Sequence, residues 1–217
     1  MIIEFSGLPR SGKSTTLDAI KNFYTRQGYD VKLLIEGVRT CPFPHHHRVK
    51  TAFWTIHKVI NDIIKYSTIS TKDTLILQDR GLFDAMAFIK LLKIDALASV
   101  EDIKLLDDFC ACEGVNNFLS FVSNWAKFVD LVILFETPPE VVLDRDLASR
   151  MNAGPALITN SNTLRSLMNA YKCIKNDYGE MFPKLVSVKT HNRDKLDIAI
   201  QIKNLINDEL LNQTKSK

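Results

Sequence analysis

Short apolar runs alternate with longer amphipathic stretches along the 217-residue chain. Five of these runs are rich in Ile, Val, Leu and Phe and have the length of a single buried strand. The predicted strands cover residues 2–7, 31–35, 74–78, 130–135 and 185–188. Because each strand is followed by a stretch of different periodicity, the pattern predicts alternating β and α elements.

The stretches after the strands repeat apolar residues every three or four positions, which is typical of amphipathic helices. In one of them Val49, Phe53, Ile56 and Ile60 fall on a single helical face. The predicted helices cover residues 13–24, 48–66, 81–92, 140–151, 163–178 and 196–211. We expect further helices within residues 93–127, as a helical insert.

The regular alternation predicts an α/β fold of three layers, a five-stranded parallel sheet with helices on both faces. No internal repeat or linker divides the chain, so we expect one domain over residues 1–217. In such sheets ligands bind beyond the carboxyl ends of the strands. Residues at those ends are therefore the first candidates for a functional site.

A glycine-rich loop follows the first predicted strand and leads directly into a helix. Its sequence fits G-x-x-x-x-G-K-[ST], the Walker A pattern of a P-loop, in the strand and helix context that phosphate binding requires. The residues are Gly7, Leu8, Pro9, Arg10, Ser11, Gly12, Lys13, Ser14 and Thr15. The glycines allow the backbone N–H groups to point at phosphate oxygens, and the helix adds its positive end. We expect this loop to bind ATP, with Lys13 at the β- and γ-phosphates and Ser14 on Mg²⁺.

Composition narrows the class of protein. Hydrophobic residues make up 46% and charged residues 24% of the chain, and the net charge of +3 is too small to indicate nucleic-acid or membrane binding on its own. No apolar run approaches a membrane span, and Met1 leads directly into the first strand, so we expect no signal peptide and a cytoplasmic protein. The chain has four cysteines, and none of them forms a C-x-x-C pair: Cys41, Cys110, Cys112 and Cys173. We predict that all four are reduced thiols. The alternative is that Cys110 and Cys112 act as a redox sensor.

Charged residues follow three further strands. Glu36 and Arg39 follow the second, Asp79 and Arg80 end the third, and Glu136 follows the fourth. Because the carboxyl ends of parallel strands share one edge, we expect all five side chains to face one crevice with the P-loop.

Each of these strand-end residues has a functional role and a structural alternative. Asp79 is the best partner of Ser14 for Mg²⁺, or else the N-cap of the next helix. Arg80 would hold a transferred or acceptor phosphate, or else form a surface ion pair. Glu36 is the candidate general base for an acceptor hydroxyl, with binding of metal or acceptor, or a structural role, as alternatives.

The predicted helix 140–151 carries Arg145 and Arg150 and runs into a Gly-Pro loop. We expect a lid at about residues 145–158 that brings these arginines over the phosphates, where they neutralise charge and exclude water. Arg10 is expected to serve the same electrostatic purpose. The alternative is a solvated helix face with ion pairs inside the helix.

A polar loop precedes the helix 48–66. His45, His46 and His47 are adjacent and cannot all face one ion from regular structure, so we favour an acceptor-site entrance over a metal site. Phe53 belongs to the apolar stripe of the helix. Trp54 lies off that stripe, and we expect it in the acceptor pocket.

In combination, these motifs resemble the P-loop nucleoside and nucleotide kinases, nearest the thymidylate kinase and deoxynucleoside kinase group. The matching segments are GLPRSGKST at 7–15, LLIEG at 33–37, LILQDRGLFD at 75–84 and TPPEVVLDRDLASR at 137–150. The resemblance implies a P-loop NTPase fold, ATP and Mg²⁺. It implies catalytic roles for Lys13, Arg10, Glu36, Asp79, Arg80, Arg145 and Arg150. The chain departs from the group where Gly rather than Pro follows Glu36, and in the insert at 93–127.

We predict phosphoryl transfer from ATP to a nucleoside monophosphate or a nucleoside. The arginine count favours the monophosphate, whose two negative charges need guanidinium partners, whereas Glu36 favours a hydroxyl acceptor. The expected acceptor-binding residues are Glu36, Arg39, Arg48, Trp54 and Arg80. Alternatives are a kinase for a nucleic-acid 5′ end or a small metabolite, or a nucleotide-binding module without catalysis. A regulatory GTPase is disfavoured, because the chain lacks the N-K-x-D motif that reads guanine. A homodimer is one possible assembly.

Overall fold

Five parallel strands form one sheet in the centre of the computed structural model, which describes residues 1–43, 48–69, 73–94, 114–150 and 161–215. The strands are β1 Ile2–Gly7, β2 Asp30–Leu34, β3 Thr74–Asp79, β4 Leu131–Glu136 and β5 Leu185–Lys189. Their order is β2-β3-β1-β4-β5, so β1 is central and the loop after it lies in the middle of the sheet edge. The predicted five-stranded parallel sheet is confirmed.

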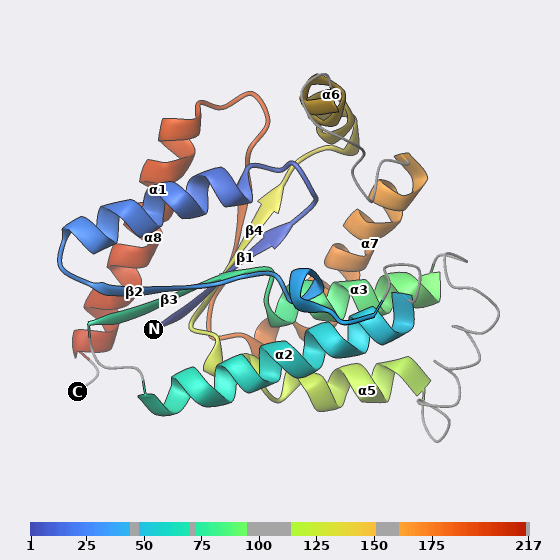
Figure 1. Ribbon diagram of the computed structural model, residues 1–217, viewed down its shortest axis with the longest axis horizontal. Coiled ribbons are helices and arrows are strands. Elements are labelled where there is room, and N and C mark those ends of the chain that lie inside the picture. Colours follow the sequence, from blue (N-terminus) through green and yellow to red (C-terminus); the bar gives the residue numbers. More distant parts are fainter. Residues whose placement is uncertain (44–47, 70–72, 95–113, 151–160, 216–217) are drawn as a thin grey trace.

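Helices cover both faces of this sheet, which gives the predicted three layers (Figure 1). The helices are α1 Lys13–Arg26, α2 Arg48–Ile69, α3 Leu82–Ile94, α5 Gly114–Ser123, α6 Pro139–Arg150, α7 Ser161–Tyr178 and α8 Lys195–Lys215. Three short 3₁₀ helices are η1 Gly37–Thr40, η2 Ala126–Phe128 and η3 Gly179–Met181. Helices α1 and α8 lie on one face, and α2, α3, α5 and α7 lie on the other (Figure 1).

Alternation along the strands divides the core in two. In β4, Leu131, Ile133 and Phe135 pack toward α1 and α8, whereas Val132 and Leu134 pack toward α3 and α7. This is the two-residue period of a strand that is buried on both faces. The same period decides toward which face each charged residue at a strand end points.

The second strand is displaced by one residue and is more exposed than predicted. β2 ends at Leu34 instead of residue 35, and Ile35 is 47% exposed. The reason is its place at the edge of the sheet, where β2 pairs with β3 alone. Of the predicted helical insert at 93–127, the structure describes α3 to Ile94, α5 and η2; residues 95–113 lie outside the described part of the chain.

The turn from β1 into the P-loop requires glycine. Gly7 has φ 132°, and a Cβ added there would lie 2.6 Å from the carbonyl oxygen of Phe135 on β4. Any other residue would push the loop away from the sheet. The P-loop is therefore seated tightly on the strand pair β1–β4. Among the described residues, no helix combines the length and apolarity of a membrane span.

Candidate functional site

The P-loop curls around the ammonium group of Lys13. Gly12 has φ 101° and Arg10 φ 58°, so the loop turns twice through the left-handed region before α1 begins. Lys13 donates to the carbonyl oxygens of Gly7 and Leu8, each at 2.7 Å, and lies 3.4 Å from Ser11 Oγ. Burial, reinforced by the nearby charge of Arg80, lowers the pKa of Lys13 to about 7. A buried cation of this kind would gain strongly from the negative charge of a phosphate.

Arg80 joins the strand-end residues into one ion-pair network. Its Nε lies 3.0 Å from Glu36 Oε1, at the end of β2, and its Nη1 lies 2.9 Å from Asp84 Oδ2, on the first turn of α3. The guanidinium also lies over the ring of Phe88, 5.7 Å from its centre. Arg80 is only 8% exposed, so the alternative of a surface ion pair is wrong. The neighbouring carboxylates, Asp84 foremost, outweigh burial and raise its pKa well above the ordinary value.

Asp84 connects this network to the P-loop and to α7. Its Oδ1 accepts hydrogen bonds from the backbone N–H of Gly7, at 3.4 Å, and from the hydroxyl of Tyr171. Asp84 is 1% exposed, and its carboxylate contacts Gly7 at the end of β1, Arg80 just after β3 and Tyr171 on α7. It holds the first residue of the P-loop and the guanidinium of Arg80 in a fixed relation.

Glu4, in the middle of β1, caps the helix that carries Asp84. Its two carboxylate oxygens accept from the backbone N–H groups of Phe83 and Asp84, at 3.0 and 2.9 Å, and from Ser6 Oγ at 2.5 Å. The cap of α3 is therefore Glu4, and the alternative role of Asp79 as N-cap is wrong. Burial raises the pKa of Glu4 to about 7, against the effect of these hydrogen bonds.

Asp79 and Ser14 fit a Mg²⁺ ion by the chemistry of their oxygens. Asp79 ends β3 beside β1, and Ser14 is exposed in the first turn of α1. Within the described residues, neither side chain has an ion pair or a hydrogen bond, which leaves a hydroxyl and a carboxylate open to a hard cation. In the same residues, no group of three or more His, Cys, Asp or Glu side chains could hold a metal ion by themselves. His45, His46 and His47 lie outside the described part.

Arg145 lies across the P-loop. Its guanidinium donates to the carbonyl oxygen of Arg10, at 3.1 Å, and to that of Thr190 beyond β5, at 3.2 Å. The side chain of Arg10 pairs in turn with Asp146, at 3.4 Å. Arg145 thus contacts the P-loop, and the alternative of a solvated helix face is wrong for it. The side chain of Arg150 and the remainder of the predicted lid lie outside the described residues.

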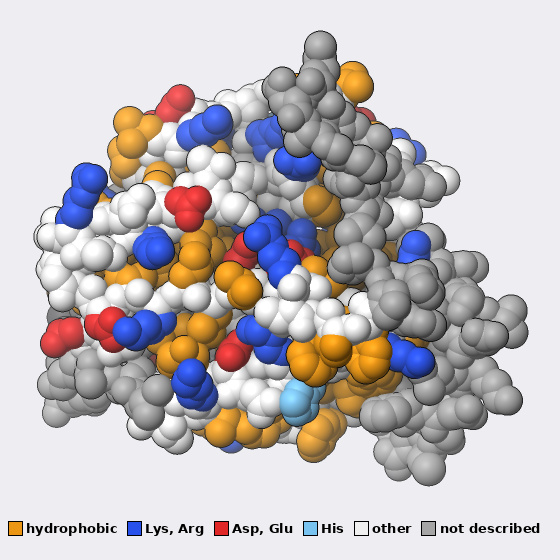
Figure 2. All heavy atoms as spheres, in the orientation of Figure 1, with side chains coloured by type: hydrophobic (Ala, Val, Ile, Leu, Met, Phe, Trp, Pro, Cys, Tyr) orange, Lys and Arg blue, Asp and Glu red, His pale blue; other side chains and the backbone are white. Residues whose placement is uncertain are grey.

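Three of the predicted acceptor-binding residues lie on η1 and on the first two turns of α2, which contact each other. Trp54 is half-buried, and its indole N–H lies 3.4 Å from Thr40 Oγ1 in η1, the turn that follows Glu36. Arg39 is exposed, with its Nε 3.9 Å from Glu36 Oε2. Arg48 is exposed at the start of α2. Figure 2 shows acidic and basic side chains close together in the middle of the face that is turned to the viewer.

Glu136 does not share the site, contrary to the prediction. It follows Leu134 at the two-residue period and therefore points to the face covered by α7, where its Oε1 lies 3.8 Å from the ammonium of Lys175. The sequence places Glu136 at the correct edge of the sheet, and the pleat turns its side chain away from the P-loop.

Three residues of the site escaped the sequence analysis: Glu4, Asp84 and Tyr171. For Asp84 a signal was present, because it follows Arg80 by four residues and a helix brings such pairs together. Glu4 interrupts an apolar strand, and a buried carboxylate needs partners. Nothing local marks Tyr171, whose contact with Asp84 spans 87 residues.

No protein-family model matches the sequence, and no curated protein matches it. Among solved structures, the chain is similar to a deoxyadenosine kinase from M. mycoides bound to dCMP and dCDP, with a TM-score of 0.65, 18% identity, and coverage of 96% of this chain and 100% of that one. It is similar to a thymidylate kinase from Candida albicans, with a TM-score of 0.67, 16% identity, and coverage of 96% and 92%. These likenesses establish the fold, which is the P-loop fold that the sequence resemblance implies.

Proposed function

We propose that the protein transfers a phosphoryl group from ATP to a nucleoside or a nucleoside monophosphate. One observation carries the proposal: Asp84 connects the first residue of a phosphate-binding loop to the Arg80–Glu36 pair. Loops that bind phosphate serve many activities, but here a buried arginine and a candidate base are held at a fixed place beside it. The kinases with the same fold support this class of reaction.

The P-loop residues 7–15 would bind the ATP phosphates through backbone N–H groups and Lys13. Ser14 and Asp79 would hold Mg²⁺, which when bound neutralises charge on the phosphates. On binding ATP, Lys13 would leave the carbonyl oxygens of Gly7 and Leu8 for the phosphates. Arg145 already lies on the loop and would need only a small side-chain change to meet the same charge.

On the acceptor side, Glu36 would take the proton of a hydroxyl as that oxygen attacks the γ-phosphorus and ADP leaves. Burial raises the pKa of Glu36 above its ordinary value, and Arg80 acts in the opposite direction. A carboxylate that is more basic than usual and fixed by a guanidinium suits this role.

This geometry favours a nucleoside hydroxyl over the monophosphate that the arginine count predicts. The charge of Arg80 is already balanced by Glu36 and Asp84, so an incoming phosphate dianion would meet two carboxylates beside that one arginine. Of the predicted acceptor-binding residues in the described part of the chain, the exposed Arg39 and Arg48 would then compensate for it. We therefore propose a nucleoside as the preferred acceptor, with the monophosphate as the second candidate.

The test is a panel of nucleosides and nucleoside monophosphates offered with radiolabelled ATP and Mg²⁺, with products separated by chromatography. Glu36→Gln should lower kcat on a nucleoside by about a hundredfold, in the range of general-base contributions. Glu209→Gln is the matched control, because Glu209 is also partly buried in an ion pair, with Lys184, but lies on α8. Label transfer to monophosphates alone would refute the preferred acceptor. ATP binding without label transfer to any member of the panel would refute the enzyme class proposed here.

A further inference from the structure

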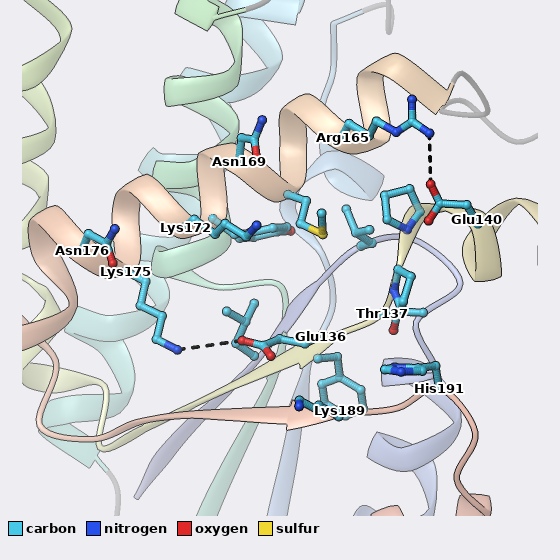
Figure 3. A pocket seen from close by; sticks show the side chains of 17 residues that line it. Glu136, Thr137, Glu140, Arg165, Asn169, Lys172, Lys175, Asn176, Lys189 and His191 are labelled. Atoms are coloured by element: carbon cyan, nitrogen blue, oxygen red, sulfur yellow. Dashed lines mark hydrogen bonds and ion pairs between the residues drawn. The ribbon is translucent and has the colours of Figure 1, made fainter.

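A pocket lies on the face of the sheet covered by α7 (Figure 3), and its lining includes neither Arg80 nor Glu36. Its floor is the ends of β4 and β5, one wall is α7, and the first turn of α6 closes one end. It encloses about 730 Å³, a volume typical of small-molecule sites. The proposed reaction uses none of the polar side chains that line it.

Basic side chains from two elements surround this pocket. Lys172 and Lys175 come from α7, and Lys189 comes from the end of β5 (Figure 3). Lys175 donates to Ser187 Oγ at 2.8 Å and lies 3.8 Å from Glu136 Oε1. In the described part of the chain, the ammonium groups of Lys172 and Lys189 have neither an ion pair nor a hydrogen bond. With Arg165, four basic side chains line the pocket against the two carboxylates of Glu136 and Glu140, and this excess of positive charge favours an anionic ligand.

One of the side chains that line this pocket has a buried polar atom without a partner among the described residues. His191 follows β5 and lines the pocket, and its Nδ1 is buried with no hydrogen-bond partner among the described residues. A buried ring nitrogen that is left unpaired costs free energy, which a ligand would recover. The nearby side chain of Thr137 is already engaged with Thr190. A ligand that reaches Nδ1 would supply the partner that the described residues do not.

The pocket also has an apolar part that reaches the proposed active site. Met168 and Pro138 are half-buried in its lining, and Leu8 of the P-loop contributes to the same wall. Tyr171 lines the pocket too, and its hydroxyl donates to Asp84. An occupant would thus lie against Leu8 of the P-loop and against Tyr171, which is hydrogen-bonded to Asp84.

We propose that this pocket binds a small phosphorylated molecule through Lys172, Lys189 and His191, at a site separate from the phosphates on the P-loop. The lysines would hold the phosphate, and the apolar surface around Met168 and Pro138 would accommodate the remainder of the ligand. Two sources fit this chemistry: a nucleoside phosphate, or a phosphate anion without a base.

The experiment is isothermal titration of the full chain, saturated with Mg²⁺ and a non-hydrolysable ATP analogue, with AMP in one arm and pyrophosphate in the other. The double variant Lys172→Glu/Lys189→Glu should raise the Kd of AMP or pyrophosphate at this pocket by about tenfold or more. Each exposed charge contact is worth up to about one kcal/mol, and both contacts are reversed here. Lys21→Glu/Lys65→Glu is the control with the same net charge; both of its lysines lie outside the pocket. The control should bind as the wild type does.

Binding in both arms would identify phosphate alone as the determinant, and binding of AMP alone would identify a nucleotide. Lys172→Gln/Lys189→Gln should lose less affinity than the charge reversal, which separates a charge effect from loss of the fold. Thermal unfolding of each variant checks the fold directly. Two outcomes would overturn the proposal. The first is that the pocket variant and the control variant bind AMP or pyrophosphate with equal affinity. The second is that neither AMP nor pyrophosphate binds to protein that is saturated with the ATP analogue.

Discussion

Replacing Asp84 by asparagine is expected to destabilise the protein by about 3 kcal/mol. The change keeps the size of the side chain and one acceptor oxygen but removes the charge that faces Arg80 Nη1 at 2.9 Å. Removing one partner of a buried ion pair usually costs about 3–5 kcal/mol, because the other charge stays buried and unpaired. Arg80 retains Glu36 at 3.0 Å, which places the expected loss at the lower end of that range.

The hydrogen bond from Tyr171 gives a second way to measure how much this network contributes to the free energy of unfolding. Tyr171→Phe removes one hydrogen bond to a buried carboxylate and is expected to cost about 2 kcal/mol, within the range for bonds to charged groups. Because both replacements weaken the same hydrogen bond, the double variant should lose less stability than the two single variants together, by about 1 kcal/mol. Domains of this kind unfold with about 5–15 kcal/mol, so each single variant should stay folded and measurable.

The assay is urea unfolding at constant pH, followed by tryptophan fluorescence and by circular dichroism. The matched control is Tyr178→Phe, on the same helix, which loses an exposed hydrogen bond to the carbonyl oxygen of Asn116 and should cost under about 1 kcal/mol. Asp84→Asn should also lower kcat/KM, since Gly7 and Arg80 share this carboxylate. An unfolding free energy of Asp84→Asn within about 0.5 kcal/mol of the wild type, or strictly additive losses in the double variant, would refute the central place of Asp84.

The remaining predictions concern charge at the P-loop and on β1. Lys13→Ala should abolish turnover with an unchanged circular dichroism spectrum, because its buried ammonium would be the cation beside the phosphates in the proposed reaction. Near-normal turnover of a folded variant would contradict this. Since the pKa of Lys13 is about 7 without nucleotide, the protein should take up protons when it binds ATP at pH 8. Isothermal titration should then give a binding enthalpy that depends on the ionisation enthalpy of the buffer. A binding enthalpy that is independent of the buffer would exclude this proton uptake. Burial raises the pKa of Glu4 to about 7, so its contribution to the free energy of unfolding is fully present below about pH 4.5 and is lost as pH rises through 7. Glu4→Gln should remove this pH dependence of the free energy of unfolding. An equal pH dependence in the variant would argue against a buried titrating Glu4. Arg145→Ala should lower kcat by about tenfold or more with little change in stability, measured by steady-state kinetics and thermal unfolding, and an unchanged kcat would exclude it from the reaction.

Much of the fold could be predicted because its signals are local. Apolar runs and helical stripes are written over stretches of five to twenty residues, and the P-loop pattern lies in one short segment between Gly7 and Thr15. The parallel sheet follows from the alternation of these elements, since parallel neighbours need crossover helices. Lys13, Ser14 and Asp79 could be placed at one edge of the sheet for the same reason.

The partners of those residues could not be predicted, because they depend on which elements become neighbours. The strand order places β3 beside β1, and only then do Glu4 and α3 meet, across 79 residues. The packing of α7 against α3 brings Tyr171 to Asp84, and the pleat of β4 turns Glu136 toward Lys175 instead of the P-loop. The sequence by itself thus determined the Walker A pattern of the loop and the layered fold around it. The tertiary structure alone decided which charges are paired and buried beside that loop, because pairing and burial arise only when distant segments exclude water together.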